Sequence, residues 1–178
     1  MIKLLSNRRT GNQDPNSSQA EGYRTEKLVK ELYGWKNLNE KYNNYITPID
    51  FIDKDGRSHQ TQGRQYRYGS YHFTYFERDW YKNYVDVILI CKSSDGKIIE
   101  RIYRIPFEKE IKKKRKSIGI YKNPTIDRYG SLYIPWYEEY RVTDEDELKK
   151  VNEVWKKIRI SKTINKLYIR FNKDHDIR

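Results

Sequence analysis

Residues 48–64 read PIDFIDKDGRSHQTQGR, and this stretch predicts a β-hairpin. The apolar residues on its first arm favour a strand, and the polar run Asp53–Gly56 is typical of a turn. Glycine at the end of that run suits a three-residue loop at 54–56. In this register Asp50 stands opposite Gln60, whereas a loop one residue shorter or longer would shift the pairing by one.

The predicted hairpin brings a carboxylate next to side-chain amides. Gln60 and Gln62 occupy alternate positions of one strand and therefore share a face. Mg²⁺ takes oxygen ligands, keeps several waters, and needs few protein groups beside substrate phosphates. Asp50 and the amide oxygen of Gln60 would supply such a site. A basic residue two positions after Gln60 would then orient or activate an attacking water.

The spacing of these residues resembles the PD-(D/E)XK nuclease superfamily, especially small type II restriction endonucleases. Asp50 is followed by nine residues and then by QTQGR, residues 60–64. Gln60 stands at the Glu position, where some members carry Gln, and Glu26 resembles the helical glutamate that many members add. The resemblance spans about residues 20–108.

This resemblance implies a sequence-specific double-stranded DNA endonuclease that hydrolyses phosphodiester bonds with Mg²⁺, for which Mn²⁺ could substitute. The implied catalytic residues are Asp50, Gln60, Gln62 and Glu26. The implied metal ligands are Asp50, Gln60 and Glu26. A palindromic target would call for a twofold homodimer, since each subunit supplies one site per strand.

Gln62 departs from the superfamily pattern, which has lysine at this position. A neutral amide cannot act as a base or bring positive charge to the scissile phosphate. In one explanation Arg64 or Lys92 takes over the lysine function. In the other, the chain is a Lys-to-Gln variant that binds DNA and metal weakly and cuts slowly or not at all. The second is favoured, because QTQGR differs from QTKGR by one residue.

The charge balance also points to DNA. The net charge is +12, from 37 basic and 25 acidic residues, and the chain has 17 tyrosines. A basic domain of this kind most often meets a polyanion, unless the charge serves only solubility. Beside the predicted site, the expected DNA contacts are Arg64, Tyr66, Arg67 and Tyr68. Further along the chain lies a basic run with two possible interpretations, a second DNA contact or a solvated charged surface. It consists of Lys112, Lys113, Lys114, Arg115 and Lys116.

The rest of the pattern predicts one α/β (mixed α+β) domain, with a central mixed β-sheet flanked by helices as in restriction endonucleases. Apolar residues at helical spacing predict a helix over about 19–33, ended by Gly34. The run Tyr84–Cys91 predicts a central strand buried on both faces. Alternating strands are expected at 69–76 and 98–105 in the same sheet, and a second helix after Thr143.

We divide this single domain, residues 1–178, into three parts. Residues 1–17 form a polar N-terminal arm, and residues 20–108 form the catalytic core. Residues 109–178 hold the basic segment and a C-terminal helix for DNA recognition or dimerisation.

Other features narrow the class of protein. No run approaches the roughly 18 apolar residues of a membrane span, and MIKLLSNRRT lacks a signal-peptide core. The single cysteine, Cys91, lies in an apolar run and is expected to be buried in a reducing compartment. We therefore expect a cytoplasmic protein, prokaryotic or phage-encoded. The alternatives are a homing or phage endonuclease of the same superfamily and a non-catalytic nucleic-acid-binding protein.

Overall fold

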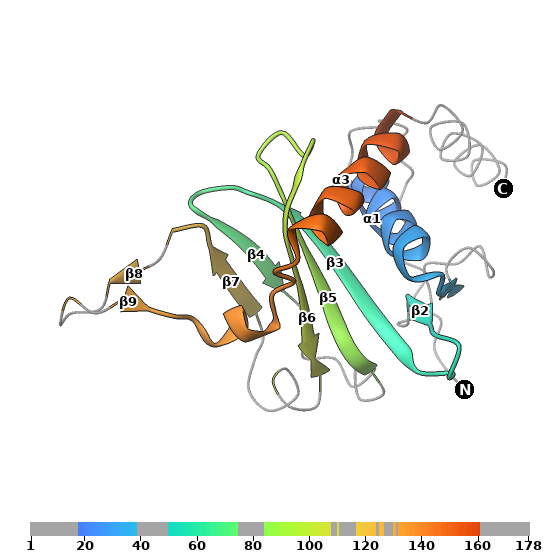
Figure 1. Ribbon diagram of the computed structural model, residues 1–178, viewed down its shortest axis with the longest axis horizontal. Helices are drawn as coiled ribbons and strands as arrows, with labels where there is room; N and C mark the ends of the chain where they lie inside the picture. The colour runs from blue at the N-terminus through green and yellow to red at the C-terminus, as the bar shows by residue number, and fades with distance from the viewer. Residues whose placement is uncertain are drawn as a thin grey trace, which may run out of the picture.

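The computed structural model describes residues 18–38, 50–74, 84–107, 110, 117–123, 125–126, 130 and 132–160. Within these ranges the fold is mixed α/β, as predicted, with a five-stranded mixed sheet and two further two-stranded sheets (Figure 1). The helices are α1 (Ser18–Tyr33), the 3₁₀ helix η3 (Trp136–Tyr140) and α3 (Glu145–Ile160). The strands are β1 (Lys36–Asn37), β2 (Phe51–Ile52), β3 (Ser58–Gln65), β4 (Ser70–Thr74), β5 (Tyr84–Lys92), β6 (Ile99–Pro106), β7 (Ser117–Tyr121), β8 (Thr125–Ile126) and β9 (Leu132–Tyr133).

The central sheet has the strand order β1-β2-β3-β5-β6. The β2–β3 and β5–β6 pairs are antiparallel, whereas β3 and β5 run parallel. Figure 1 shows α1 and α3 side by side, and both helices pack on the same face of this sheet.

The hairpin between β2 and β3 has the predicted register. Phe51 pairs with His59, and the backbone N–H of Asp53 donates to the Arg57 carbonyl at 3.0 Å. The loop is the three-residue loop 54–56, in which Gly56 takes a φ of 78° that glycine adopts without strain. The Asp53 carboxylate accepts backbone N–H groups from within the turn. This register puts Asp50 beside Gln60.

Both predicted helices are present and end where the sequence indicates. Gly34, at a φ of 66°, follows α1 and donates its N–H to the Lys30 carbonyl, closing the last turn. At the start of α3, the Asp144 carboxylate accepts the N–H groups of Asp146 and Glu147 and caps the helix.

Strand β5 is buried on both faces, which confirms the prediction for the apolar run. Its residues Ile88 and Ile90 join α1 and α3 in one core cluster. The alternate residues Val87, Leu89 and Cys91 belong to a second cluster on the other face. Burial raises the pKa of the Cys91 thiol, so this cysteine is a core residue and not a nucleophile.

The prediction that the strand at 69–76 joins the central sheet was wrong. Strand β4 pairs with β7 in a separate sheet, with Tyr71 opposite Ile120. The reason is that Tyr71 and Phe73 bury their rings against Val87 and Leu89, so this pair of strands forms a second layer. In the described part of the chain, the helices α1 and α3 cover only the opposite face.

Several predicted parts of the chain lie outside the described residues. These parts are the N-terminal arm 1–17, the basic residues Lys112, Lys113, Lys114, Arg115 and Lys116, and the tail after residue 160.

Candidate functional site

Asp50 lies directly before β2 and is buried, with 8% of its surface exposed. Its Oδ2 accepts the backbone N–H of Thr61 at 2.9 Å, which fixes the carboxylate against β3. The neighbouring Gln60 turns its amide oxygen into the protein, where Oε1 is buried and accepts no hydrogen bond from any described residue. A buried acceptor of this kind normally has a partner. A carboxylate and an orphaned amide oxygen therefore stand on adjacent strands.

Gln62 shares the face of Gln60, as predicted. In the parallel β3–β5 register, Gln60 and Gln62 align with Val87 and Leu89, which belong to the core cluster opposite the helices. Thr61 and Gly63 align instead with residues under α1. The Oε1 of Gln62 is buried like that of Gln60. The two amide oxygens thus lie on the side of the sheet that α1 does not cover.

Glu26 approaches from the other side. It lies on α1, where its Oε2 accepts a hydrogen bond from Nδ2 of Asn37 at 3.2 Å. Asn37 pairs with Phe51, the residue after Asp50. The helix glutamate is therefore connected to the Asp50 strand through one side-chain amide at the edge of the sheet.

Lys92 does not replace the missing lysine. Its Nζ is buried under α1, 2.7 Å from Thr25 Oγ1 and 3.1 Å from Glu21 Oε2. Burial lowers the pKa of Lys92, although Glu21 acts in the opposite direction. Burial raises the pKa of Glu21, but Lys92 and Arg24 outweigh it and leave that pKa lowered. Lys92 serves to join α1 to the sheet.

Gly63, the glycine of QTQGR, makes this contact possible. A Cβ atom there would lie 2.6 Å from Thr25 Oγ1 and 2.8 Å from Lys92 Cε. Such distances are far shorter than ordinary van der Waals contact. Glycine thus lets α1 approach β3 closely.

The predicted DNA contacts differ in exposure. Arg64 and Arg67 are exposed on and just after β3, and Arg64 donates to the Gly63 carbonyl at 2.9 Å. Tyr66 is half-buried and packs against Tyr71 with ring centroids 5.3 Å apart, so it belongs to the second core layer.

Tyr68 is fully exposed at the tip of the β3–β4 turn. Backbone hydrogen bonds join Arg67 and Ser70 in both directions, at 3.0 and 3.1 Å, and leave a two-residue turn. Both turn residues have positive φ, 50° at Tyr68 and 85° at Gly69. Asparagine and glycine favour this conformation, whereas a tyrosine in it is strained. The exposed position of the Tyr68 ring is therefore accompanied by backbone strain at Tyr68.

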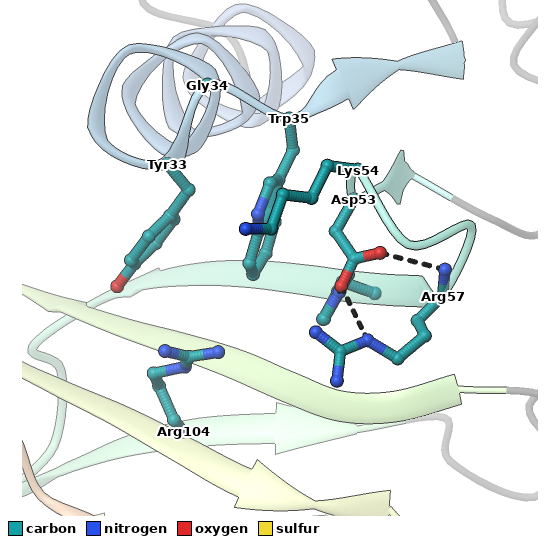
Figure 2. Close-up of a pocket in the computed structure, with 8 residues that line it drawn as sticks. Tyr33, Gly34, Trp35, Asp53, Lys54, Arg57 and Arg104 are labelled. Atoms are coloured by element: carbon teal, nitrogen blue, oxygen red, sulfur yellow. Dashed lines mark hydrogen bonds and ion pairs between the residues drawn. The ribbon is translucent and has the colours of Figure 1, made fainter.

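A second cluster was not predicted from the sequence. A pocket of about 480 Å³ opens beside the end of α1 (Figure 2). Its lining residues are Tyr33, Gly34, Trp35, Asp53, Lys54, Arg57, His59 and Arg104. In Figure 2 the side chains of Tyr33 and Trp35 descend from the end of α1, and Arg104 rises from the sheet below them. Segments far apart in the sequence meet there.

His59 is the centre of a buried ion-pair network behind this pocket. Its Nδ1 lies 2.6 Å from Asp86 Oδ1 and its Nε2 lies 3.1 Å from Asp53 Oδ2, while its ring stacks on Trp35 at 3.8 Å. Arg104 completes the network with Nη2 at 3.0 Å from Asp86 Oδ2. Burial raises the pKa of Asp86, but His59 and Arg104 outweigh it and leave that pKa below its usual value. The alternation of side chains along β3 could have indicated that His59 lies on the face opposite Gln60, but not which carboxylates it contacts.

The donor set around Asp50 fits Mg²⁺ in chemistry. Asp50 offers carboxylate oxygens and Gln60 an amide oxygen, and the buried Oε1 of Gln60 lacks a hydrogen-bond partner among the described residues. Only one of these groups is charged, so the set is weaker than the usual pair of carboxylates. Among the described residues, no group of three or more His, Cys, Asp or Glu side chains is arranged to hold a metal.

Comparison of the chain with models of known protein families and with curated protein sequences finds no match. No helix in the described ranges is long and apolar enough to cross a membrane.

Proposed function

We propose that this chain is a Mg²⁺-dependent endonuclease that hydrolyses phosphodiester bonds in double-stranded DNA, with an activity reduced by Gln62. The observation that carries the proposal is the pairing of the fixed Asp50 carboxylate with the buried, unpartnered Oε1 of Gln60. An orphaned acceptor next to a carboxylate is the arrangement expected where a cation binds. In this proposal the enzyme is a cytoplasmic homodimer, prokaryotic or phage-encoded, that recognises a specific sequence.

In this proposal Asp50 and Gln60 would hold the ion, while Glu26, on the α1 side of the sheet, would act on the site through Asn37. When bound, Mg²⁺ would stabilise negative charge on the scissile phosphate and on the leaving oxygen. Gln62 would occupy the position beside the attacking water, where its amide can accept or donate a hydrogen bond but cannot take a proton. Arg64 and Arg67 would contact phosphates next to the cleaved bond.

Cleavage of a supercoiled plasmid with Mg²⁺ or Mn²⁺ tests the metal site. We expect the parent chain to nick the plasmid slowly, and Asp50→Asn to lower that rate by about tenfold or more, since it removes the negative charge of the proposed ligand beside Gln60. Asp55→Asn is the matched control, because Asp55 is an exposed carboxylate in the same hairpin. Equal nicking by the parent and Asp50→Asn would show that Asp50 is not a metal ligand.

Tyr68 provides a separate test of DNA contact. Tyr68→Asn is expected to raise the free energy of unfolding by about 0.5–1 kcal/mol, because asparagine tolerates positive φ. The same change is expected to weaken binding of a duplex with a single-stranded overhang about tenfold, since stacking of an aromatic ring on an unpaired base contributes roughly 1–3 kcal/mol. Urea unfolding and fluorescence anisotropy with a labelled duplex that carries this overhang measure the two effects.

Tyr68→Phe is the control for this prediction, because it keeps both the aromatic ring and the backbone strain. It should bind like the parent and be no more stable. Unchanged duplex binding by Tyr68→Asn would remove Tyr68 from the DNA interface.

A further inference from the structure

Basic side chains outnumber acidic ones among the described residues that line the pocket beside α1. Among the described lining residues Lys54, Arg57 and Arg104 are basic and Asp53 is acidic, while Asp86 binds Arg104 from behind the pocket. Asp53 is already engaged by Arg57 Nε at 2.8 Å and by His59. In Figure 2 the side chains of Lys54 and Arg104 reach into the pocket from the hairpin loop and from β6. An anionic ligand would therefore be favoured there.

The arginine head groups are held in place before any ligand arrives. Arg104 uses Nε and Nη2 to bind Asp86 at 3.3 and 3.0 Å, and its guanidinium lies 5.3 Å from the Tyr33 ring centroid. Its side chain is still 43% exposed. A guanidinium fixed on one side and open on the other is well suited to a phosphate group.

Tyr33 adds a hydrogen-bond donor without a partner. Its hydroxyl oxygen is buried, and no described residue bonds to it. Leaving a buried hydroxyl unsatisfied destabilises the fold, so a site that retains one is best explained by a ligand that completes it. The rings of Tyr33 and Trp35, stacked at 4.7 Å, give the same pocket an apolar wall.

His59 is not available for chemistry in this pocket. Only 1% of its surface is exposed, and both ring nitrogens already meet carboxylates. The cluster therefore supports the pocket wall, and the pocket is a binding site.

We propose that this pocket binds a nucleoside monophosphate unit. The phosphate would accept hydrogen bonds from Tyr33 Oη, Arg104 and Lys54, and the sugar or base would pack against Tyr33 and Trp35. The volume of about 480 Å³ falls within the roughly 300–1,000 Å³ of small-molecule sites. The unit could be a free nucleotide or the 5′-phosphorylated end of a DNA strand, which share this chemistry. The inference goes beyond the nuclease proposal and does not depend on it.

Isothermal titration calorimetry with the full chain tests the proposal. The probes are dAMP, deoxyadenosine, inorganic phosphate, and an adenine trinucleotide with and without a 5′-phosphate. We expect dAMP or the phosphorylated trinucleotide to bind at least about tenfold more tightly than its unphosphorylated counterpart. The phosphorylated trinucleotide binding more tightly than dAMP would identify a strand end as the source, and equal affinity would identify a free nucleotide.

Two variants locate the site. Tyr33→Phe removes only the unpartnered hydroxyl, and Lys54→Gln removes an exposed charge, so both should fold. Each is expected to weaken binding about five- to tenfold. Tyr121→Phe and Lys97→Gln, at exposed positions outside the pocket lining, should bind like the parent.

The proposal is overturned if none of the phosphorylated probes binds at millimolar concentration, or if inorganic phosphate binds as tightly as the nucleotide. It is also overturned if Tyr33→Phe and Lys54→Gln bind like the parent. Asp50→Asn should leave nucleotide binding unchanged, so failure of the nuclease proposal and failure of this one are distinguishable.

Discussion

Gln62→Lys is expected to raise the rate of Mg²⁺-dependent plasmid cleavage by about 100-fold or more over the parent chain. The new ammonium would lie on the same face of β3 as Gln60, next to the proposed metal ligands. A lysine there brings positive charge to the scissile phosphate and can orient or deprotonate the attacking water. The amide of Gln62 can form a hydrogen bond with that water, but it brings no positive charge and cannot take a proton.

Two controls separate this effect from a simple gain in positive charge. Ser94→Lys adds the same charge in the exposed turn after β5 and should cut no faster than the parent. Combining Gln62→Lys with Asp50→Asn should abolish the gain, because the lysine acts only together with the metal ligands. A folded Gln62→Lys protein that cuts no faster than the parent would show that position 62 does not handle the attacking water.

Local signals in the sequence predicted the hairpin and the helices well. The loop 54–56 follows from Asp53 and Gly56, because an Asx turn and a left-handed glycine together allow one loop length. That loop in turn fixes the pairing of Asp50 with Gln60. The end of α1 likewise follows from Gly34. In these cases a few neighbouring residues determine the structure.

Contacts between distant segments could not be predicted in the same way. The sequence allows Lys92 to replace the motif lysine, because the residues next to it do not show that it packs against α1. The structure places it under α1, where Glu21 and Thr25 hold it. The separate β4–β7 sheet depends on which core face Tyr71 and Phe73 join. The alternation of side chains along a strand predicts which face each residue occupies, but not which layer packs on that face.

The pocket network was missed for the same reason. His59 lies directly before the candidate residue Gln60, and the alternation of side chains along β3 indicates only which face His59 occupies. Its partner Asp86 is 27 residues away, and Arg104 comes from a third strand. The parallel pairing of β3 with β5 brings His59 to Asp86, and the pairing of β5 with β6 brings Arg104 to the same place.

Asp86→Asn is expected to cause the largest loss of stability, roughly 3–5 kcal/mol near neutral pH, which is the range for breaking a buried ion pair. The Asp86 carboxylate meets His59 Nδ1 at 2.6 Å and Arg104 Nη2 at 3.0 Å, and its side chain is only 10% exposed. Removing the charge leaves the Arg104 guanidinium and the His59 ring facing a neutral amide in a poorly hydrated site. Asp55→Asn, at an exposed pair with Arg57, should change the unfolding free energy by less than about 1 kcal/mol.

The pH dependence of this loss distinguishes an ion pair from simple packing. Burial raises the pKa of Asp86, but the lowering effect of His59 and Arg104 is larger. The folded pKa therefore lies below the unfolded value of about 3.9. The unfolded chain therefore binds a proton at this position before the folded chain does. The stabilisation by Asp86 is complete above about pH 4 and is lost as the pH falls toward the folded pKa.

Urea unfolding from about pH 7 down to about pH 3 measures this dependence. The parent should lose stability steeply below about pH 4, whereas Asp86→Asn should show a shallower decline. Some acid sensitivity should remain in the variant, because Arg57 and His59 also lower the pKa of Asp53 against the opposing effect of burial. The two stability curves should therefore converge as the pH falls. Parallel curves would mean that Asp86 stabilises the fold by shape and hydrogen bonding, without its charge.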